Sequence, residues 1–180
     1  MPESLKEVFA RGYRARAEND LAEARAAFLE AVRRASLETD RPALAEALCG
    51  LAQAERGIGN PGAAIHQYAN AALLYRELGS RERFAYAIRH EADILRETGK
   101  TTEAKPRYLE AEEIYRQLGD RATLDLANTL RGLALASKGI DASKPSGRRH
   151  VSFTKNAKSR LASMSVTANF LNDRSLAWID

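Results

Sequence analysis

Apolar residues recur at steps of three and four along most of the chain, as Leu44, Leu48 and Leu51 illustrate. This spacing is typical of amphipathic helices. No stretch of any length alternates apolar with polar residues, so no strand is predicted. The predicted helices cover about residues 4–17, 20–37, 42–57, 61–78, 81–97, 101–118 and 121–137.

Four of these helices begin beside a residue that favours a helix start. Ser4 with Glu7 three residues later predicts a capping box. Asp40, Ser80 and Asp120 are each predicted to cap the helix that follows.

The same residue types return every forty residues. The recurring sets are Ala24, Ala64 and Ala104; Phe28, Tyr68 and Tyr108; Ala31, Ala71 and Ala111; Gly12, Ala52, Ala92 and Gly132; and Asn19, Gly59, Gly99 and Gly139. A fixed period in this range indicates a solenoid of stacked repeats. Small residues let helices approach closely, aromatic rings fill the space beside them, and Gly or Asn ends a helix. The sequence therefore predicts an all-α superhelix of three helical hairpins plus one further helix.

The order of these residues resembles the tetratricopeptide repeat (TPR) family, which has small residues, a turn glycine and then Ala-x3-aromatic-x2-Ala. In the second repeat the matching residues are Leu48, Leu51, Ala52, Gly59, Ala64, Tyr68 and Ala71. The resemblance covers about residues 4–139, as repeats 4–40, 41–80 and 81–120 and a partial repeat 121–139. Departures are Arg11, Glu91 and Arg131, where a core leucine is typical, and Asn19 in place of the turn glycine.

The period exceeds the usual length of about 34 residues for this family. We attribute the difference to longer loops at residues 78–81 and 118–121, a variant that looks like the TPR arrays of bacterial regulators and kinesin light chains.

The resemblance implies a right-handed superhelix whose first helices line a concave binding face. The residues it assigns to this face are Phe9, Tyr13, Arg16, Gln53, Arg56, Tyr86, Arg89, Asp93 and Arg96. Arg16, Arg56 and Arg96 recur once per repeat and could form a ladder for the carboxylates of an extended peptide. The alternative is that each arginine only complements the dipole of its own helix and stays solvated.

The carboxylate clamp that some family members use for chaperone C-termini is absent. Its positions hold Phe9, Tyr13, Gly50, Tyr86 and His90. We interpret His90 as an ordinary polar residue of the groove or surface, and the single cysteine, Cys49, as a small groove or interface residue.

Composition favours one soluble helical domain, because 44% of the 180 residues are hydrophobic and 29% are charged. No signal peptide or membrane span is visible, and a lone cysteine excludes an internal disulfide. A cytoplasmic location is therefore expected.

The basic character of the chain belongs to its end. Residues 138–180 carry a net charge of +5, and the remainder carries −1. Residues 140–180 break every repeat column, and two explanations stay open. One is a disordered basic extension. The other is a shifted reading frame, because the neighbouring frame over residues 144–156 permits Trp, Ala and Tyr in the register of Tyr108, Ala111 and Tyr115.

Catalysis is not expected, because the three histidines are far apart in the repeats and no metal-binding or phosphate-binding motif occurs. Glu110, Glu112 and Glu113 are expected to face solvent. The leading hypothesis is a protein-interaction scaffold, free-standing or part of a larger regulator, which binds an acidic peptide or protein and needs no cofactor, metal, small-molecule substrate or membrane. The alternative is a nucleic-acid-associated protein that uses its basic tail.

If the tail comes from a shifted reading frame, the last predicted helix has lost the second helix that would cover it. Leu126, Leu130 and Leu133 are therefore expected to lack their normal cover, and self-association through this helix is a further expectation.

Overall fold

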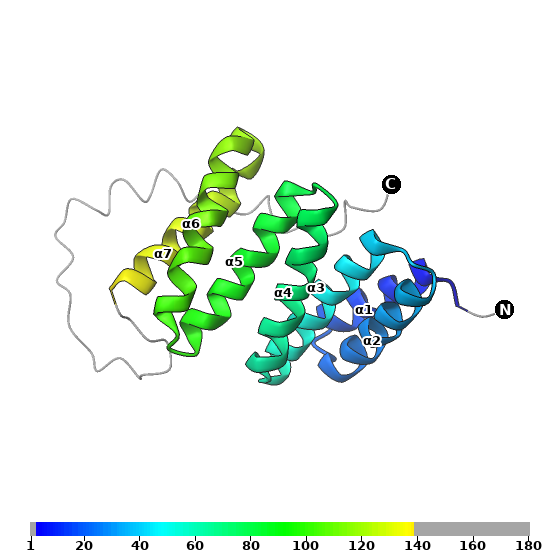
Figure 1. The fold of residues 1–180 in the computed structure, drawn as a ribbon. Helices are drawn as coiled ribbons and strands as arrows, with labels where there is room; N and C mark the ends of the chain where they lie inside the picture. Colours follow the sequence, from blue (N-terminus) through cyan, green and yellow to red (C-terminus); the bar gives the residue numbers. More distant parts are fainter. Residues whose placement is uncertain (1–2, 139–180) are drawn as a thin grey trace, which may run out of the picture. The chain divides into compact units, whose positions relative to one another are not determined.

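The structure is a computed structural model, and it describes residues 3–138. Within this range the chain forms the α-helices α1 (Leu5–Ala17), α2 (Leu21–Leu37), α3 (Arg41–Ile58), α4 (Pro61–Glu77), α5 (Arg81–Glu97), α6 (Thr101–Leu118) and α7 (Thr123–Ser137). A short 3-10 helix, η1 (Gly119–Ala122), precedes α7. The described residues contain no strand. The predicted all-α fold of three helical hairpins and one further helix is confirmed (Figure 1).

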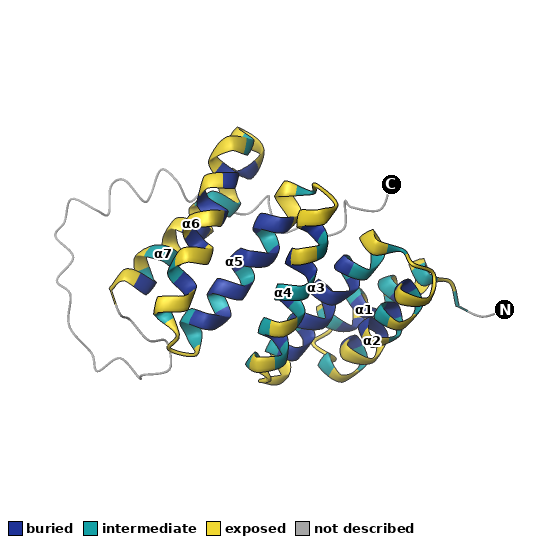
Figure 2. Cartoon of the chain, viewed as in Figure 1, coloured by how far each residue is buried: buried dark blue, intermediate teal, exposed yellow. Residues whose placement is uncertain are grey.

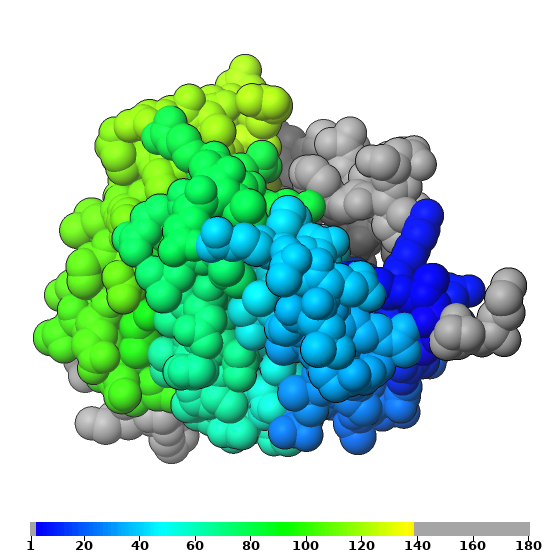
Figure 3. All heavy atoms as spheres, turned by 45° about the vertical axis from the view of Figure 1, so that its right-hand side comes forward, coloured from blue at the N-terminus to red at the C-terminus, as the bar shows by residue number. Residues whose placement is uncertain are grey.

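Each helix packs against the helix that follows it, which gives a stack of hairpins (Figure 1). Neighbouring helices lie side by side in the colour order of the chain in the space-filling view (Figure 3). The first helices of the hairpins also meet, because α1 packs on α3 and α5 packs on α7. Side chains of the first helices are therefore brought together across hairpin boundaries.

Every helix up to α6 is followed by a backbone position with positive φ. These positions are Asn19 (60°), Thr39 (56°), Gly59 (91°), Gly79 (69°), Gly99 (82°) and Gly119 (69°). They recur every twenty residues, so the turns inside hairpins and between hairpins sit at equivalent places. Thr39 is the least suited of them, because a β-branched residue is strained in the left-handed region.

Longer loops between hairpins account for only a small part of the longer repeat. Residues 38–40, 78–80 and 119–122 join hairpins, whereas residues 18–20, 59–60 and 98–100 join helices within them, so the two kinds of connection differ by a residue or two at most. Most of the extra length of the repeat lies in helices of 17 or 18 residues from α2 to α6.

The predicted caps are confirmed in part. Ser4 and Glu7 form the capping box, and Asp40 accepts a hydrogen bond from the backbone N–H of Ala43. Ser80 occupies the cap position of α5 without a side-chain hydrogen bond. Asp120 does not cap, because it belongs to η1 and α7 begins only at Thr123.

The recurring alanines and aromatic residues form the core, as Figure 2 shows by the buried faces between helices. Nine of them have no exposed surface: Ala24, Ala64, Ala104, Phe28, Tyr68, Tyr108, Ala31, Ala71 and Ala111. Ala52 and Ala92 are equally buried. Gly12 faces the ring of Phe28, and Gly132 faces the ring of Tyr108. The pairing of small residues with aromatic rings is therefore confirmed.

Three glutamates of the described residues are buried as ion pairs. Glu55 lies 2.7 Å from Arg25, Glu91 lies 3.3 Å from Arg107, and Glu112 lies 2.6 Å from Arg116. The expectation that Glu112 faces solvent is wrong, whereas Glu110 and Glu113 are exposed. Burial raises the pKa of Glu91 above its ordinary value, and Arg107 opposes this shift.

Helix α7 carries large apolar side chains in contact with solvent. Leu124 is 64% exposed and Leu130 is 40% exposed. The residue equivalent to Leu124 in the preceding repeat, Phe84, is only 9% exposed. Leu126 and Leu133 are half-buried against the core, so the expectation that they lack cover is wrong. The predicted tail, residues 140–180, and Gly139 lie outside the described residues.

Candidate binding surface on the first helices

The residues predicted to bind a partner lie together on α1, α3 and α5. We use the name first-helix face for Phe9, Tyr13, Arg16, Glu46, Gln53, Arg56, Tyr86, Arg89, His90, Asp93, Arg96 and Glu97. His90 and Glu97 were not among the predicted binding residues. Within each of the three helices these residues are spaced mainly three, four or seven positions apart, so they lie on one side of the helix.

Hydrogen bonds join the first-helix face from one hairpin to the next. The hydroxyl of Tyr13 on α1 donates to Glu46 Oε1 on α3 over 2.7 Å. The amide of Gln53 on α3 donates to the hydroxyl oxygen of Tyr86 on α5 over 2.6 Å. Burial raises the pKa of Tyr86 to about 12, so this phenol is neutral at physiological pH. These contacts hold the rings of Tyr13 and Tyr86 in place on the first-helix face.

The three recurring arginines have different surroundings. The guanidinium of Arg16 lies over the ring of Tyr13, 5.4 Å from its centroid. Arg56 lies 2.5 Å from Glu97 Oε1, and Arg96 lies 3.3 Å from the same oxygen. Within residues 3–138 Arg16 forms no ion pair. The structure therefore joins two members of the predicted ladder through an internal carboxylate and leaves the third without one.

Arg89 and Asp93 are partners of each other. Arg89 is 8% exposed and donates to Asp93 Oδ2 over 3.1 Å and to Asp125 Oδ1 on α7 over 3.5 Å. Asp93 also accepts a hydrogen bond of 2.6 Å from the hydroxyl of Tyr108. Both residues hold α5 to its neighbours, so neither presents a charge without a counter-charge on the first-helix face.

His90 is a half-buried residue of this face, with aromatic neighbours that the sequence did not predict. Its ring stacks on Tyr68, with centroids 5.5 Å apart, and meets Tyr86 edge to face at 4.3 Å. Nε2 lies 2.8 Å from Arg89 Nη2, and because a guanidinium only donates, the proton of the neutral ring sits on Nδ1. Nδ1 and the hydroxyl of Tyr68 are buried without a hydrogen-bond partner in the described residues.

Burial, and then the positive charges of Arg89, Arg56 and Arg16, hold the pKa of His90 well below its ordinary value. The ring therefore binds a proton in the unfolded chain at a higher pH than in the folded chain. Folding stability must fall as the pH drops below about 6.5, with a slope approaching about 1.4 kcal/mol per pH unit from this one residue. We expect His90→Gln to lose less stability than the wild-type chain between pH 7 and pH 5.

Denaturant unfolding at pH 7 and at pH 5 measures this difference directly. His66→Gln is the matched control, because His66 is exposed on α4. An equal loss of stability on acidification in all three proteins would contradict the assignment of a buried neutral ring.

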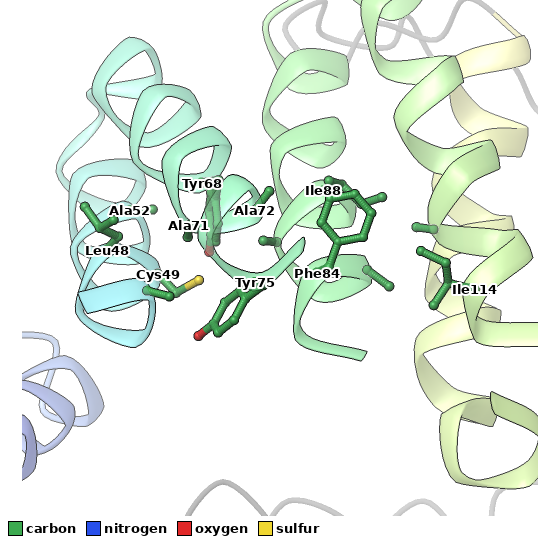
Figure 4. Close-up of a cluster of buried hydrophobic side chains, with 14 of the residues drawn as sticks. Leu48, Cys49, Ala52, Tyr68, Ala71, Ala72, Tyr75, Phe84, Ile88 and Ile114 are labelled. Carbon is green, nitrogen blue, oxygen red and sulfur yellow. The ribbon is translucent and has the colours of Figure 1, made fainter. Parts of the chain in front are cut away.

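Cys49 belongs to the core and not to the binding face. Its side chain lies beside Tyr75 in the largest cluster of buried apolar residues (Figure 4). Burial raises the pKa of the thiol to about 12, so the reactive thiolate is not formed at neutral pH.

A pocket of about 350 Å³ lies away from the first-helix face, between α4, α5 and α6. Tyr75, Phe84 and Ile114 form its apolar floor, and Arg76, Arg81, Glu110 and Glu113 contribute charges of both signs. The sequence did not predict this pocket, because its walls come from three helices whose packing angles the repeat pattern leaves open.

No protein-family model and no curated protein sequence matches the chain. Among the described residues no three histidine, cysteine or acidic side chains gather in a way that could hold a metal ion. No helix within this range is both long enough and apolar enough to cross a membrane.

Proposed function

We propose that this chain is a protein-interaction scaffold of the tetratricopeptide type, which binds an extended peptide or partner protein on the first-helix face. The observation that carries the proposal is the arrangement of Tyr13, Arg16, Gln53, Arg56 and Tyr86. These half-buried side chains from three successive hairpins form one surface. Tyrosine and arginine are enriched where proteins recognise other proteins, because they combine apolar area with directional hydrogen bonds.

The spacing of the hairpins supports an extended ligand. Arg16, Arg56 and Arg96 recur once per hairpin, so a peptide running across α1, α3 and α5 meets a guanidinium in each of them. Arg16 provides a cation that is stacked on an aromatic ring and has no carboxylate partner in the described residues. These features favour a partner that carries acidic residues.

The basic tail on which the alternative of nucleic-acid binding rests, residues 140–180, lies outside the described residues. The structure therefore adds no observation in favour of that alternative.

Selection of displayed peptides against the immobilised full chain tests the proposed function. We expect the wild-type chain to enrich peptides with acidic residues and Arg16→Glu to lose them, because the substitution reverses the charge of the recurring arginine that has no carboxylate partner within residues 3–138. Arg14→Glu is the matched control, since Arg14 is exposed on the same helix. Enrichment of the same peptides by Arg16→Glu, with both variants folded by circular dichroism, would refute the assignment of the binding face.

A further inference from the structure

Arg56 and Arg96 come from different hairpins and converge on one carboxylate oxygen. Glu97 Oε1 lies 2.5 Å from Arg56 Nη2 and 3.3 Å from Arg96 Nη2. Two guanidinium groups that share one carboxylate are placed to bind another carboxylate in the same position. The side chain of Glu97 thereby shows where a carboxylate fits on the first-helix face.

The arginines recur with the repeats, whereas the glutamate does not. Arg16, Arg56 and Arg96 are separated by forty residues each. The residues equivalent to Glu97 in the first two repeats are Ala17 and Gly57. An arginine at this place is therefore a property of every full repeat, whereas the carboxylate that pairs with Arg56 and Arg96 is supplied by the third repeat alone.

We propose that Arg56 and Arg96 form a binding site for a carboxylate of a partner peptide, and that Glu97 occupies this site until the partner displaces it. This inference rests on the proposed function, because it names the chemistry that the first-helix face recognises. Glu97 then acts as a competitor within the chain and lowers the affinity for acidic partners.

The contacts of these side chains favour displacement of Glu97 and keep Arg96 in position. About a third of each side chain is exposed in the pair of Arg56 and Glu97 (34% each), and ion pairs of such exposure are weak. Arg96 is more deeply buried (12% exposed), and its Nε also donates to the hydroxyl of Tyr108 over 3.3 Å. Tyr108 in turn donates to Asp93. Arg96 therefore stays in position when Glu97 moves away.

Fluorescence anisotropy with defined probes tests the site on the full chain. The first probe is a labelled twelve-residue peptide of alternating glycine and glutamate with an amidated C-terminus. The second replaces every glutamate with glutamine and keeps the amide, and the third is the glutamine peptide with a free C-terminal carboxylate. Comparison of the three probes separates side-chain carboxylates from a terminal one.

We expect Glu97→Gln to bind the glutamate probe about three- to tenfold more tightly than the wild-type chain, the range that loss of two weak ion pairs implies. Glu77→Gln is the matched control, because it removes one negative charge and one exposed ion pair, with Arg41, from another surface. The double variant Glu97→Gln with Arg56→Gln should not show this gain in affinity for the glutamate probe.

Three outcomes would overturn the inference. An equal gain in Glu77→Gln would show that net charge alone is responsible. A gain that persists in the double variant would remove Arg56 from the site. Failure of both the wild-type chain and Glu97→Gln to bind any carboxylate probe would mean that the arginines do not receive such a ligand. None of these outcomes affects the selection of displayed peptides, which tests the proposed function through Arg16→Glu. Failure of this inference is therefore distinguishable from failure of the proposed function.

Discussion

Phe28→Ala should lower the free energy of unfolding by about 3–5 kcal/mol, because it removes a fully buried ring from a tightly packed site. The ring packs against Tyr13 edge to face at 5.3 Å and against Phe9 at 6.5 Å. It also fills the space over two glycines, Gly12 and Gly50, whose small size leaves no side chain to collapse into the cavity. Denaturant unfolding followed by circular dichroism gives the change.

The neighbouring Leu29 provides the control for this substitution. It lies on the same helix but is 39% exposed, so Leu29→Ala should cost about 1 kcal/mol or less. Similar losses for the two variants would show that the ring of Phe28 is not the packing centre of the first hairpin.

Gly50→Ala should destabilise the fold by about 3 kcal/mol, the upper end of the range for overpacking a core. A methyl group at this position would come within 2.7 Å of the Cζ of Phe28, and two other atoms of the ring would be nearer still. The ring cannot turn aside, because it is enclosed by Phe9 and Tyr13. Helices α2 and α3 would have to separate, and a lower denaturation midpoint would report it.

Gly62→Ala is the matched control, because Gly62 lies in α4 with no atom near the added methyl group. Alanine has the higher helix propensity, so this variant should be neutral or slightly more stable. Combining Gly50→Ala with Phe28→Leu should restore part of the loss, since both substitutions act on the same space. If Phe28→Leu does not reduce the loss of stability caused by Gly50→Ala, that loss does not come from the contact with the ring of Phe28.

The order of the helices was predictable from the sequence because two independent periodicities agree. Leu44, Leu48 and Leu51 define one face of α3, and the forty-residue recurrence fixes which helices pair. The start of α7 was not predictable, because Asp120 has the side chain of a helix cap but enters a 3-10 turn. The burial of Glu112 was missed because Arg116, one helical turn later, provides its counter-charge.

The positions of the residues on the first-helix face were predictable, but their contacts within the chain were not. Repeat arithmetic placed Arg56 and Arg96 on one surface, as the structure has them. It gave no sign that Glu97 would join them, because that glutamate belongs to no repeat column. The ring contacts of His90 were missed for a related reason: Tyr86 lies on the same helix, but Tyr68 comes from α4.

The left-handed backbone positions recur every twenty residues, from Asn19 to Gly119, so each helix with its turn is a unit of constant length. First and second helices nevertheless face different neighbours, since α1 also packs on α3 and α5 on α7, whereas second helices of successive hairpins in the described range do not pack on one another in this way. A gene duplication or deletion of forty codons would therefore keep each remaining helix among its usual neighbours, whereas a change of twenty would exchange the roles of all helices downstream. The chain can vary in length only by whole hairpins, and each added hairpin would lengthen the row of arginines by one.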